Sequence, residues 1–197
     1  MRKAIVNHLF FILICFLVWY KGITGPDLIW NMFLALVAYE FSLLAVYTKS
    51  KWLVVFPTLA WLAFFPNTFY MLTDIFHMGF VQGGYQANDI VTRFIPFILS
   101  ILFGVLCGVE SWHLIVQRFR LSWPYVYAIV PVLAFVSSFA ISIGRFERFN
   151  SWDLVRYPLA VVRVLLDTIS WQRLPFILGF TLLQILCLLF LENSSKK

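Results

Sequence analysis

The chain has 197 residues, of which 62% are hydrophobic and 12% charged, and it carries a formal net charge of +6. A soluble domain has about a quarter charged residues, so this composition leaves too little polar surface for a globule in water. The positive charge does not indicate nucleic-acid binding, because the lysines and arginines lie mainly at the ends of apolar runs, where lipid headgroups explain them. We therefore predict an all-α integral membrane protein with a single polytopic domain, residues 1–197.

Six apolar runs are long enough to cross a bilayer core, which takes roughly 20 helical residues. They are residues 5–20, 28–47, 52–71, 90–109, 124–143 and 174–191. No small-residue cleavage site closes the first run, so we predict a retained anchor instead of a signal peptide. Gly104 and Gly108 lie one helical turn apart in the fourth run, which favours close contact with a neighbouring helix.

Loop charges predict the orientation in the membrane. A cytoplasmic N-terminus places eight of the fifteen basic residues inside and seven outside. This margin improves when the arginines of the long segment 144–173 are set aside, since long loops obey the positive-inside rule weakly. We predict that both termini are cytoplasmic. In either orientation, alternation of the runs puts the loops after the third and fifth runs on the same side.

The segment 144–173 is an Arg-rich extramembrane or interfacial stretch within the domain. On a helix over residues 151–170, a narrow polar stripe holds Arg156, Arg163 and Asp167, and the remaining surface is mostly apolar. This pattern predicts an amphipathic helix that lies in the membrane interface. A re-entrant or buried helix is the alternative.

The third run ends in the unusually polar stretch FFPNTFYMLTDIFH. If an α-helix continues past its proline, four polar side chains fall within about 80° of one another on one face. They are Asn67, Tyr70, Asp74 and His77. A carboxylate and an imidazole at this spacing suit a proton relay, or two ligands of a metal that would also need Asp89 or Asp153. A polar seam between helices is the alternative, but buried ionisable groups are costly in a membrane. We therefore predict that these four are catalytic residues, with the metal left open.

A second polar stretch, GRFERFNSWD, follows the fifth run directly. Arg145 and Arg148 can both reach toward an anion such as a phosphate, which a guanidinium binds through two parallel hydrogen bonds in bidentate geometry. The alternative is that the arginines extend to the membrane surface without a ligand and that the following residues cap a helix. We predict a substrate-binding role for Arg145, Arg148 and Asp153, together with Arg93, which lies one turn inside the fourth run and can pair with Asp89 or Asp74.

Two motifs in this order, PNxxYxxTDxxH (66–77) and GRxxRxNSWD (144–153), carry a family resemblance. The chain resembles the domain-of-unknown-function family numbered 1361, a set of bacterial multi-pass membrane proteins. The likeness runs from the third run onward and departs at Thr68-Phe69, where the family would have Ala-Pro. The resemblance implies a bacterial membrane protein whose family has no assigned reaction.

Three functions from different classes fit these residues. The first is an enzyme at the outer membrane face, where Asp74 and His77 do general acid/base or metal work on an anionic lipid, a lipid-linked phosphate or another cell-envelope substrate. The second is a small transporter with a polar path that includes Glu40; six helices without a repeat would then have to work as a homo-oligomer. The third is a membrane scaffold whose Arg-rich loop docks a partner. We favour the enzyme, and the sequence leaves cofactors and oligomeric state open.

Overall fold

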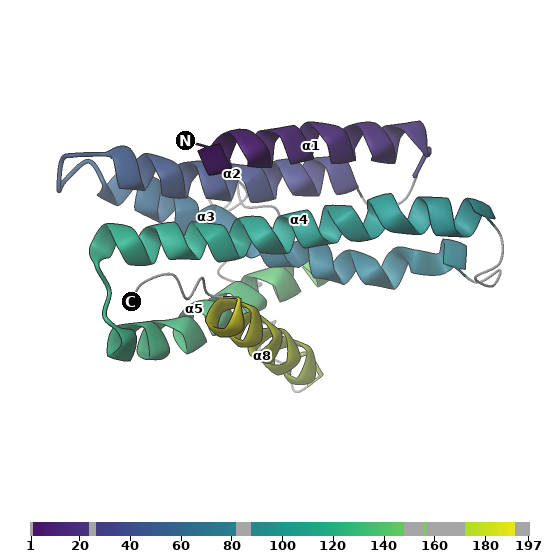
Figure 1. Ribbon diagram of the computed structural model, residues 1–197. Coiled ribbons are helices and arrows are strands. Elements are labelled where there is room, and N and C mark those ends of the chain that lie inside the picture. Colours follow the sequence, from purple (N-terminus) through teal and green to yellow (C-terminus); the bar gives the residue numbers. More distant parts are fainter. Residues whose placement is uncertain (1, 24–26, 82–87, 148–155, 157–171, 192–197) are drawn as a thin grey trace.

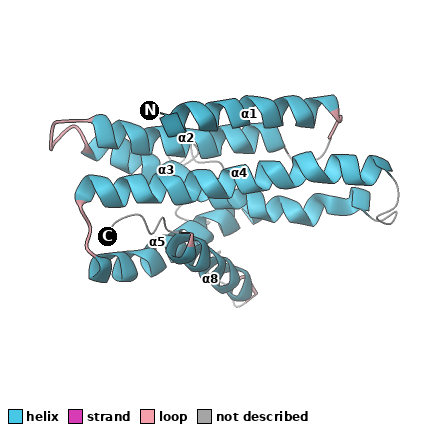
Figure 2. Cartoon of the chain, in the orientation of Figure 1, coloured by secondary structure: helices cyan, strands magenta, loops and turns pink. Residues whose placement is uncertain are grey.

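The computed structural model (Figure 1) describes all residues except 1, 24–26, 82–87, 148–155, 157–171 and 192–197. The described residues are helices, turns and loops without a β-strand (Figure 2), which confirms the all-α prediction. The helices are α1 (Arg2–Tyr20), α2 (Leu28–Tyr47), α3 (Val55–Tyr70), the 3-10 helix η1 (Met71–Val81), α4 (Asn88–Phe119), α5 (Trp123–Glu147) and α8 (Leu174–Phe190). Each predicted run coincides with one of these α-helices. The amphipathic helix predicted over 151–170 lies outside the described residues, apart from the exposed, helical Arg156.

The described helices have the length and surface of membrane spans. Five spans, which lie in α1, in α2, in α3 with the start of η1, in α4 and in α5, are long and apolar enough to cross a membrane. The apolar helix α8 is shorter, at 17 residues, which is near the lower limit of about 17 for a span. Large apolar side chains such as Ile12, Phe56 and Val132 are exposed on the outside, as a lipid-facing surface requires. The chain is a multi-pass membrane protein.

The helices form a bundle built around α2, α3 and α4. Helix α2 packs against both α3 and α4, and α1 lies lengthwise beside α2 and α4 (Figure 1). Helices α5 and α8 pack mainly against each other, on the opposite side of α4 from α1. The fully buried Gln184 of α8 joins this pair, because its side-chain amide donates a hydrogen bond to the hydroxyl of Ser138 in α5 at 2.7 Å.

Close contact between α3 and α4 confirms the prediction for the two glycines. A Cβ atom at Gly104 would lie 2.6 Å from the sulfur of Met71 and 2.9 Å from the backbone oxygen of Thr68. At Gly108, a Cβ atom would lie 2.5 Å from the Thr68 hydroxyl oxygen and 2.9 Å from the ring of Phe69. Only glycine allows the two backbones to approach this closely, and this contact fixes α3 and the start of η1 on α4.

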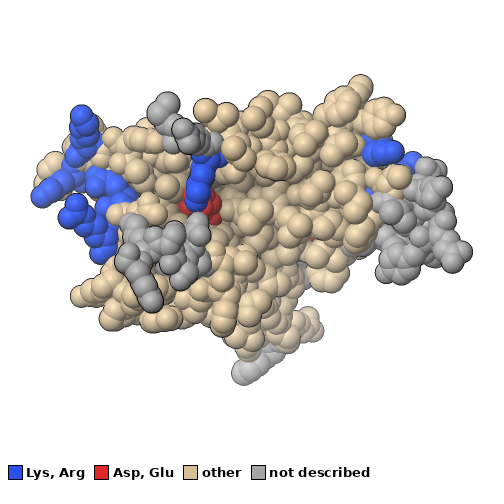
Figure 3. Space-filling model, viewed as in Figure 1, with Lys and Arg blue, Asp and Glu red and all other residues tan. Residues whose placement is uncertain are grey.

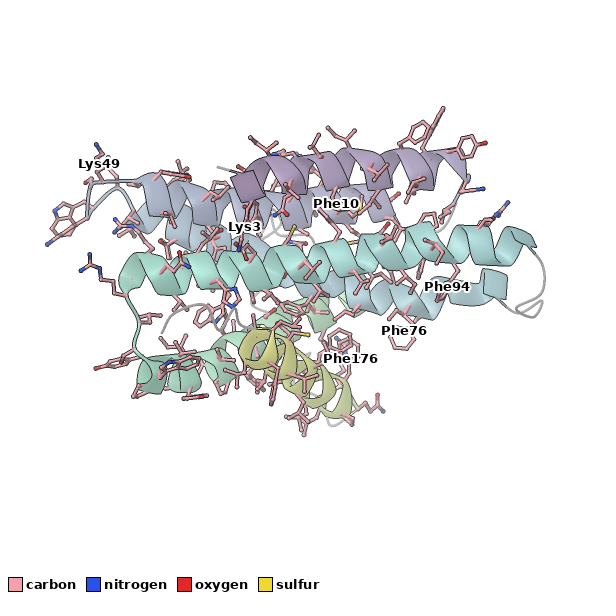
Figure 4. All side chains as sticks on the ribbon, in the orientation of Figure 1. Lys3, Phe10, Lys49, Phe76, Phe94 and Phe176 are labelled. Carbon is pink, nitrogen blue, oxygen red and sulfur yellow. The ribbon has the colours of Figure 1, made fainter. Side chains whose placement is uncertain are left out.

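Helix α4 is longer than the hydropathy predicts. The predicted run ends at residue 109, whereas the helix continues to Phe119 and has 32 residues. The backbone hydrogen bonds of a helix do not depend on side-chain polarity, so polar residues do not end it when they have partners. Here Glu110 accepts a hydrogen bond from the Lys3 ammonium group of α1 at 2.8 Å. Figure 4 shows Lys3 beside α4, well away from Lys49 at one end of the bundle.

Candidate functional site

The end of α3 is shaped by a proline and by polar side chains that bond to their own chain. Pro66 lies inside α3 and has no N–H group for the helical ladder. Three side chains donate to the carbonyl oxygen three residues earlier: Asn67 to Phe64 at 3.0 Å, Thr68 to Phe65 at 2.7 Å, and Thr73 to Tyr70 at 2.7 Å. Side-chain bonds of this kind compete with regular helix geometry. The chain leaves the α-helical conformation at Met71.

The 3-10 helix η1 replaces the last part of the predicted polar face. The prediction extended one α-helix from Asn67 to His77, and it is wrong beyond Tyr70, because a 3-10 helix has three residues per turn instead of 3.6. Residues three apart therefore share one face, and Met71 and Asp74 are both buried, at 0% and 1% exposure. A 3-10 stretch of 11 residues is unusually long, and such stretches often mark a functional or strained segment.

The buried carboxylate of Asp74 receives a hydrogen bond from α2. The side-chain amide of Asn31 donates to Oδ2 of Asp74 at 3.1 Å. Asn31 lies in the first turn of α2, where the helix dipole favours a nearby negative charge. Asp27 precedes this turn, and its exposed carboxylate makes no capping hydrogen bond and interacts electrostatically with Asp74. Neither residue could be identified from the sequence, since Asp27 is a single polar group just before an apolar run and Asn31 is a single polar group within it.

Arg145 links the second motif to the first. It lies half-buried in the last turn of α5 and interacts electrostatically with Asp74 in η1. A positive guanidinium near a buried carboxylate offsets part of the cost of removing that carboxylate from water. The structure thus brings together Asp27, Asn31, Asp74 and Arg145, from the start of α2, from η1 and from the end of α5; we call these four residues the Asp74 cluster.

For the other predicted site residues, the structure gives the element and, where the side chain is described, its exposure. Asn67 and Tyr70 are half-buried in α3. Arg93 is exposed in the second turn of α4. His77 belongs to η1, but the structure does not describe its side chain. Arg148 and Asp153 lie outside the described residues. Their predicted roles remain predictions.

A second group of ionisable side chains lies nearer the middle of the bundle. Glu110 of α4 has the Lys3 ammonium at 2.8 Å and Nδ1 of His113 at 3.9 Å. Glu40 of α2 lies 3.5 Å from Nε2 of His8 in α1, and both of these side chains are nearly half exposed. Glu40 is nine residues after Asn31, about 14 Å along the helix axis. This group is therefore separate from the Asp74 cluster.

The described residues do not contain a group of side chains arranged as metal ligands. Among those side chains, no group of three or more His, Cys, Asp or Glu could hold an ion. Asp89 and Asp153, which the sequence offered as further ligands, have side chains outside the described set. A metal at this site stays an open prediction.

Comparison with known proteins places the chain in a family. A family model described as "Protein of unknown function (DUF1361)" matches residues 30–187. The chain belongs to this family. The match covers both polar motifs and three of the four members of the Asp74 cluster; Asp27 precedes the matched residues. No curated protein and no solved structure matches the chain.

Proposed function

We propose that this DUF1361 protein is a bacterial membrane enzyme with its site at the Asp74 cluster. Its substrate would be an anionic lipid or a lipid-linked phosphate of the cell envelope. The observation that supports this most is the electrostatic interaction between Asp74 and Arg145, because it relates two polar motifs that are far apart in the sequence. A buried carboxylate in a membrane bundle is costly to maintain and is a functional-site candidate for that reason.

Asp74, Asn31 and Arg145 of the cluster each have a role that follows from their chemistry. Asp74 would exchange a proton with the bound substrate, and the 3.1 Å hydrogen bond from Asn31 would hold its carboxylate in one orientation. Arg145 has five N–H donors in a planar fork, so it can face Asp74 and bind an anionic group at the same time. His77 and Arg148, each three residues further along its motif, would complete the acid/base pair and the anion clamp.

Complementation of a deletion strain tests this proposal. We expect Asp74→Asn, Arg145→Gln and His77→Ala each to abolish rescue, although each protein still reaches the membrane and elutes as a single folded species. Glu110→Gln is the matched control, because it removes a carboxylate from the other ionisable group and should leave rescue intact. Full rescue by both Asp74→Asn and His77→Ala would rule out the enzyme at this site.

The two alternative functions make different predictions for the same strain. In a transporter with a continuous polar path, Glu40→Gln would abolish function as completely as Asp74→Asn does. Between Asn31 and Glu40, the buried residues of α2 are apolar except for Tyr39, and the apolar ones, such as Met32 and Leu36, do not favour such a path. A scaffold that docks a partner through its Arg-rich loop would keep its function with Asp74→Asn and lose it when Arg145 or Arg148 is replaced.

A further inference from the structure

Basic side chains gather at the end of the bundle opposite the Asp74 cluster. Figure 3 shows them at the end where the α2–α3 and α4–α5 turns lie. The residues are Lys49, Lys51, Arg118 and Arg120, and we call this surface the basic end. No acidic residue occurs in the sequence between Glu40 and Asp74 or between Glu110 and Glu147. Neither turn therefore supplies an acidic residue to balance these charges.

Arg118 has a structural role that sets the position of the other three. Its Nε donates to the carbonyl oxygen of Ala45 at 2.8 Å, and its Nη2 donates to that of Thr48 at 2.9 Å. These carbonyls lie at the C-terminal end of α2, which has no helical partners for them and carries a partial negative charge. The guanidinium thus ties the α2–α3 turn to the end of α4. Lys49, Lys51 and Arg120 are left exposed and close to the same surface.

Arg120 adopts a backbone conformation that normally belongs to glycine. Its φ angle is 51°, and its N–H donates to Gln117 while the next N–H donates to Val116, which closes α4 with a Schellman motif. The same pair of bonds closes α1, where the equivalent residue is Gly22 with φ 56°. The chain uses glycine for this motif at one helix end and a strained arginine at the other, which directs a positive charge to the basic end.

Exposed aromatic side chains surround these charges. Trp52, in the α2–α3 turn, is 87% exposed, and Phe56 follows it at 70%. Trp123 and Tyr125 start α5 and are also exposed. Tryptophan and tyrosine in this position lie at the level of lipid headgroups, where the ring contacts acyl chains and the polar atom contacts water. The pattern fits a lipid surface better than an acidic protein.

We propose that the basic end binds the headgroups of anionic phospholipids through Lys49, Lys51 and Arg120. In the predicted orientation, these are lipids of the cytoplasmic leaflet. Cationic side chains near an anionic leaflet each favour binding, and the effect falls with ionic strength. This site is distinct from the Asp74 cluster and does not depend on the proposed enzyme.

Thermal unfolding of the purified full chain in a neutral detergent tests the proposal. Dioleoyl-phosphatidylglycerol is added stepwise and compared with dioleoyl-phosphatidylcholine, which has the same acyl chains and no net charge. We expect phosphatidylglycerol to raise the unfolding temperature at least twice as much as phosphatidylcholine, and added salt to weaken this difference. Equal responses of the wild-type protein to the two lipids would overturn the proposal.

Three variants locate the effect. Lys49→Gln with Lys51→Gln should remove most of the response to phosphatidylglycerol. Arg120→Gly should unfold at a higher temperature than wild type without added lipid, because glycine relieves the strained φ angle, and should respond less to phosphatidylglycerol. Lys21→Gln removes a charge from the other end, at a residue without a role in the predicted substrate site, and should respond as wild type does. If this control loses the response to the same extent, or Arg120→Gly keeps it in full, the basic end is not the site.

Discussion

Asn31 in the first turn of α2 donates a hydrogen bond to the buried carboxylate of Asp74 across 3.1 Å. The two residues are 43 positions apart, and their contact joins the start of one membrane span to the end of another. Arg145 of α5 interacts electrostatically with the same carboxylate, so side chains from two other elements act on Asp74 of η1.

Replacing Asn31 should destabilise the protein. Asn31→Ala leaves a buried acceptor without its donor, which typically costs about 1–3 kcal/mol. Asn67→Ala is the matched control, since that amide donates to a backbone oxygen of its own helix turn, and we expect a smaller loss. The free energy of unfolding can be measured by titration with sodium dodecyl sulfate from a mild detergent. Equal losses for the two variants would show that the Asn31–Asp74 hydrogen bond stabilises the protein no more than a hydrogen bond within one helix turn does.

The two glycines of α4 should not tolerate a methyl group. Gly104→Ala and Gly108→Ala each introduce a Cβ atom closer than 3.0 Å to atoms of α3 or η1. Overpacking of this kind typically costs about 1–3 kcal/mol. Gly179→Ala in α8 is the control, because no atom lies within 4 Å of the new Cβ, and alanine favours a helix over glycine by about 0.5–1 kcal/mol. The same titration should therefore show opposite signs in α4 and α8.

Two cationic side chains should differ in their effect on stability. Arg118→Gln removes charged hydrogen bonds to two carbonyl oxygens at the end of α2, and we expect a loss of about 1.5–3 kcal/mol. Lys3→Gln breaks an ion pair whose lysine side chain is 65% exposed, so the loss should stay within about 1 kcal/mol. Unfolding temperatures of the two variants, measured side by side, check this order. A larger loss for Lys3→Gln would contradict it.

The sequence predicts the helices well and the site only in part. Hydropathy locates every described α-helix, because a membrane span needs about 20 apolar residues in a row. It misses the end of α4 because Glu110 is polar but has its partner, Lys3, 107 positions away. The role of Asn31 is also not predicted, because its partner Asp74 is 43 positions away and nothing near Asn31 in the sequence indicates the contact. Helical periodicity also cannot predict η1, since the change to three residues per turn depends on local side-chain bonds.

The measurement that tests the central claim most directly is a double-mutant cycle between Asp74 and Arg145. The free energy of unfolding is measured for Asp74→Asn, for Arg145→Gln and for the double variant, with a parallel cycle between Asp74→Asn and Lys49→Gln at the other end. If the two polar motifs meet at one site, the double variant loses less stability than the sum of the single losses, by about 0.5–3 kcal/mol. The cycle with Lys49 should be additive. If the losses for Asp74→Asn and Arg145→Gln are additive within about 0.5 kcal/mol, the two motifs do not form one site.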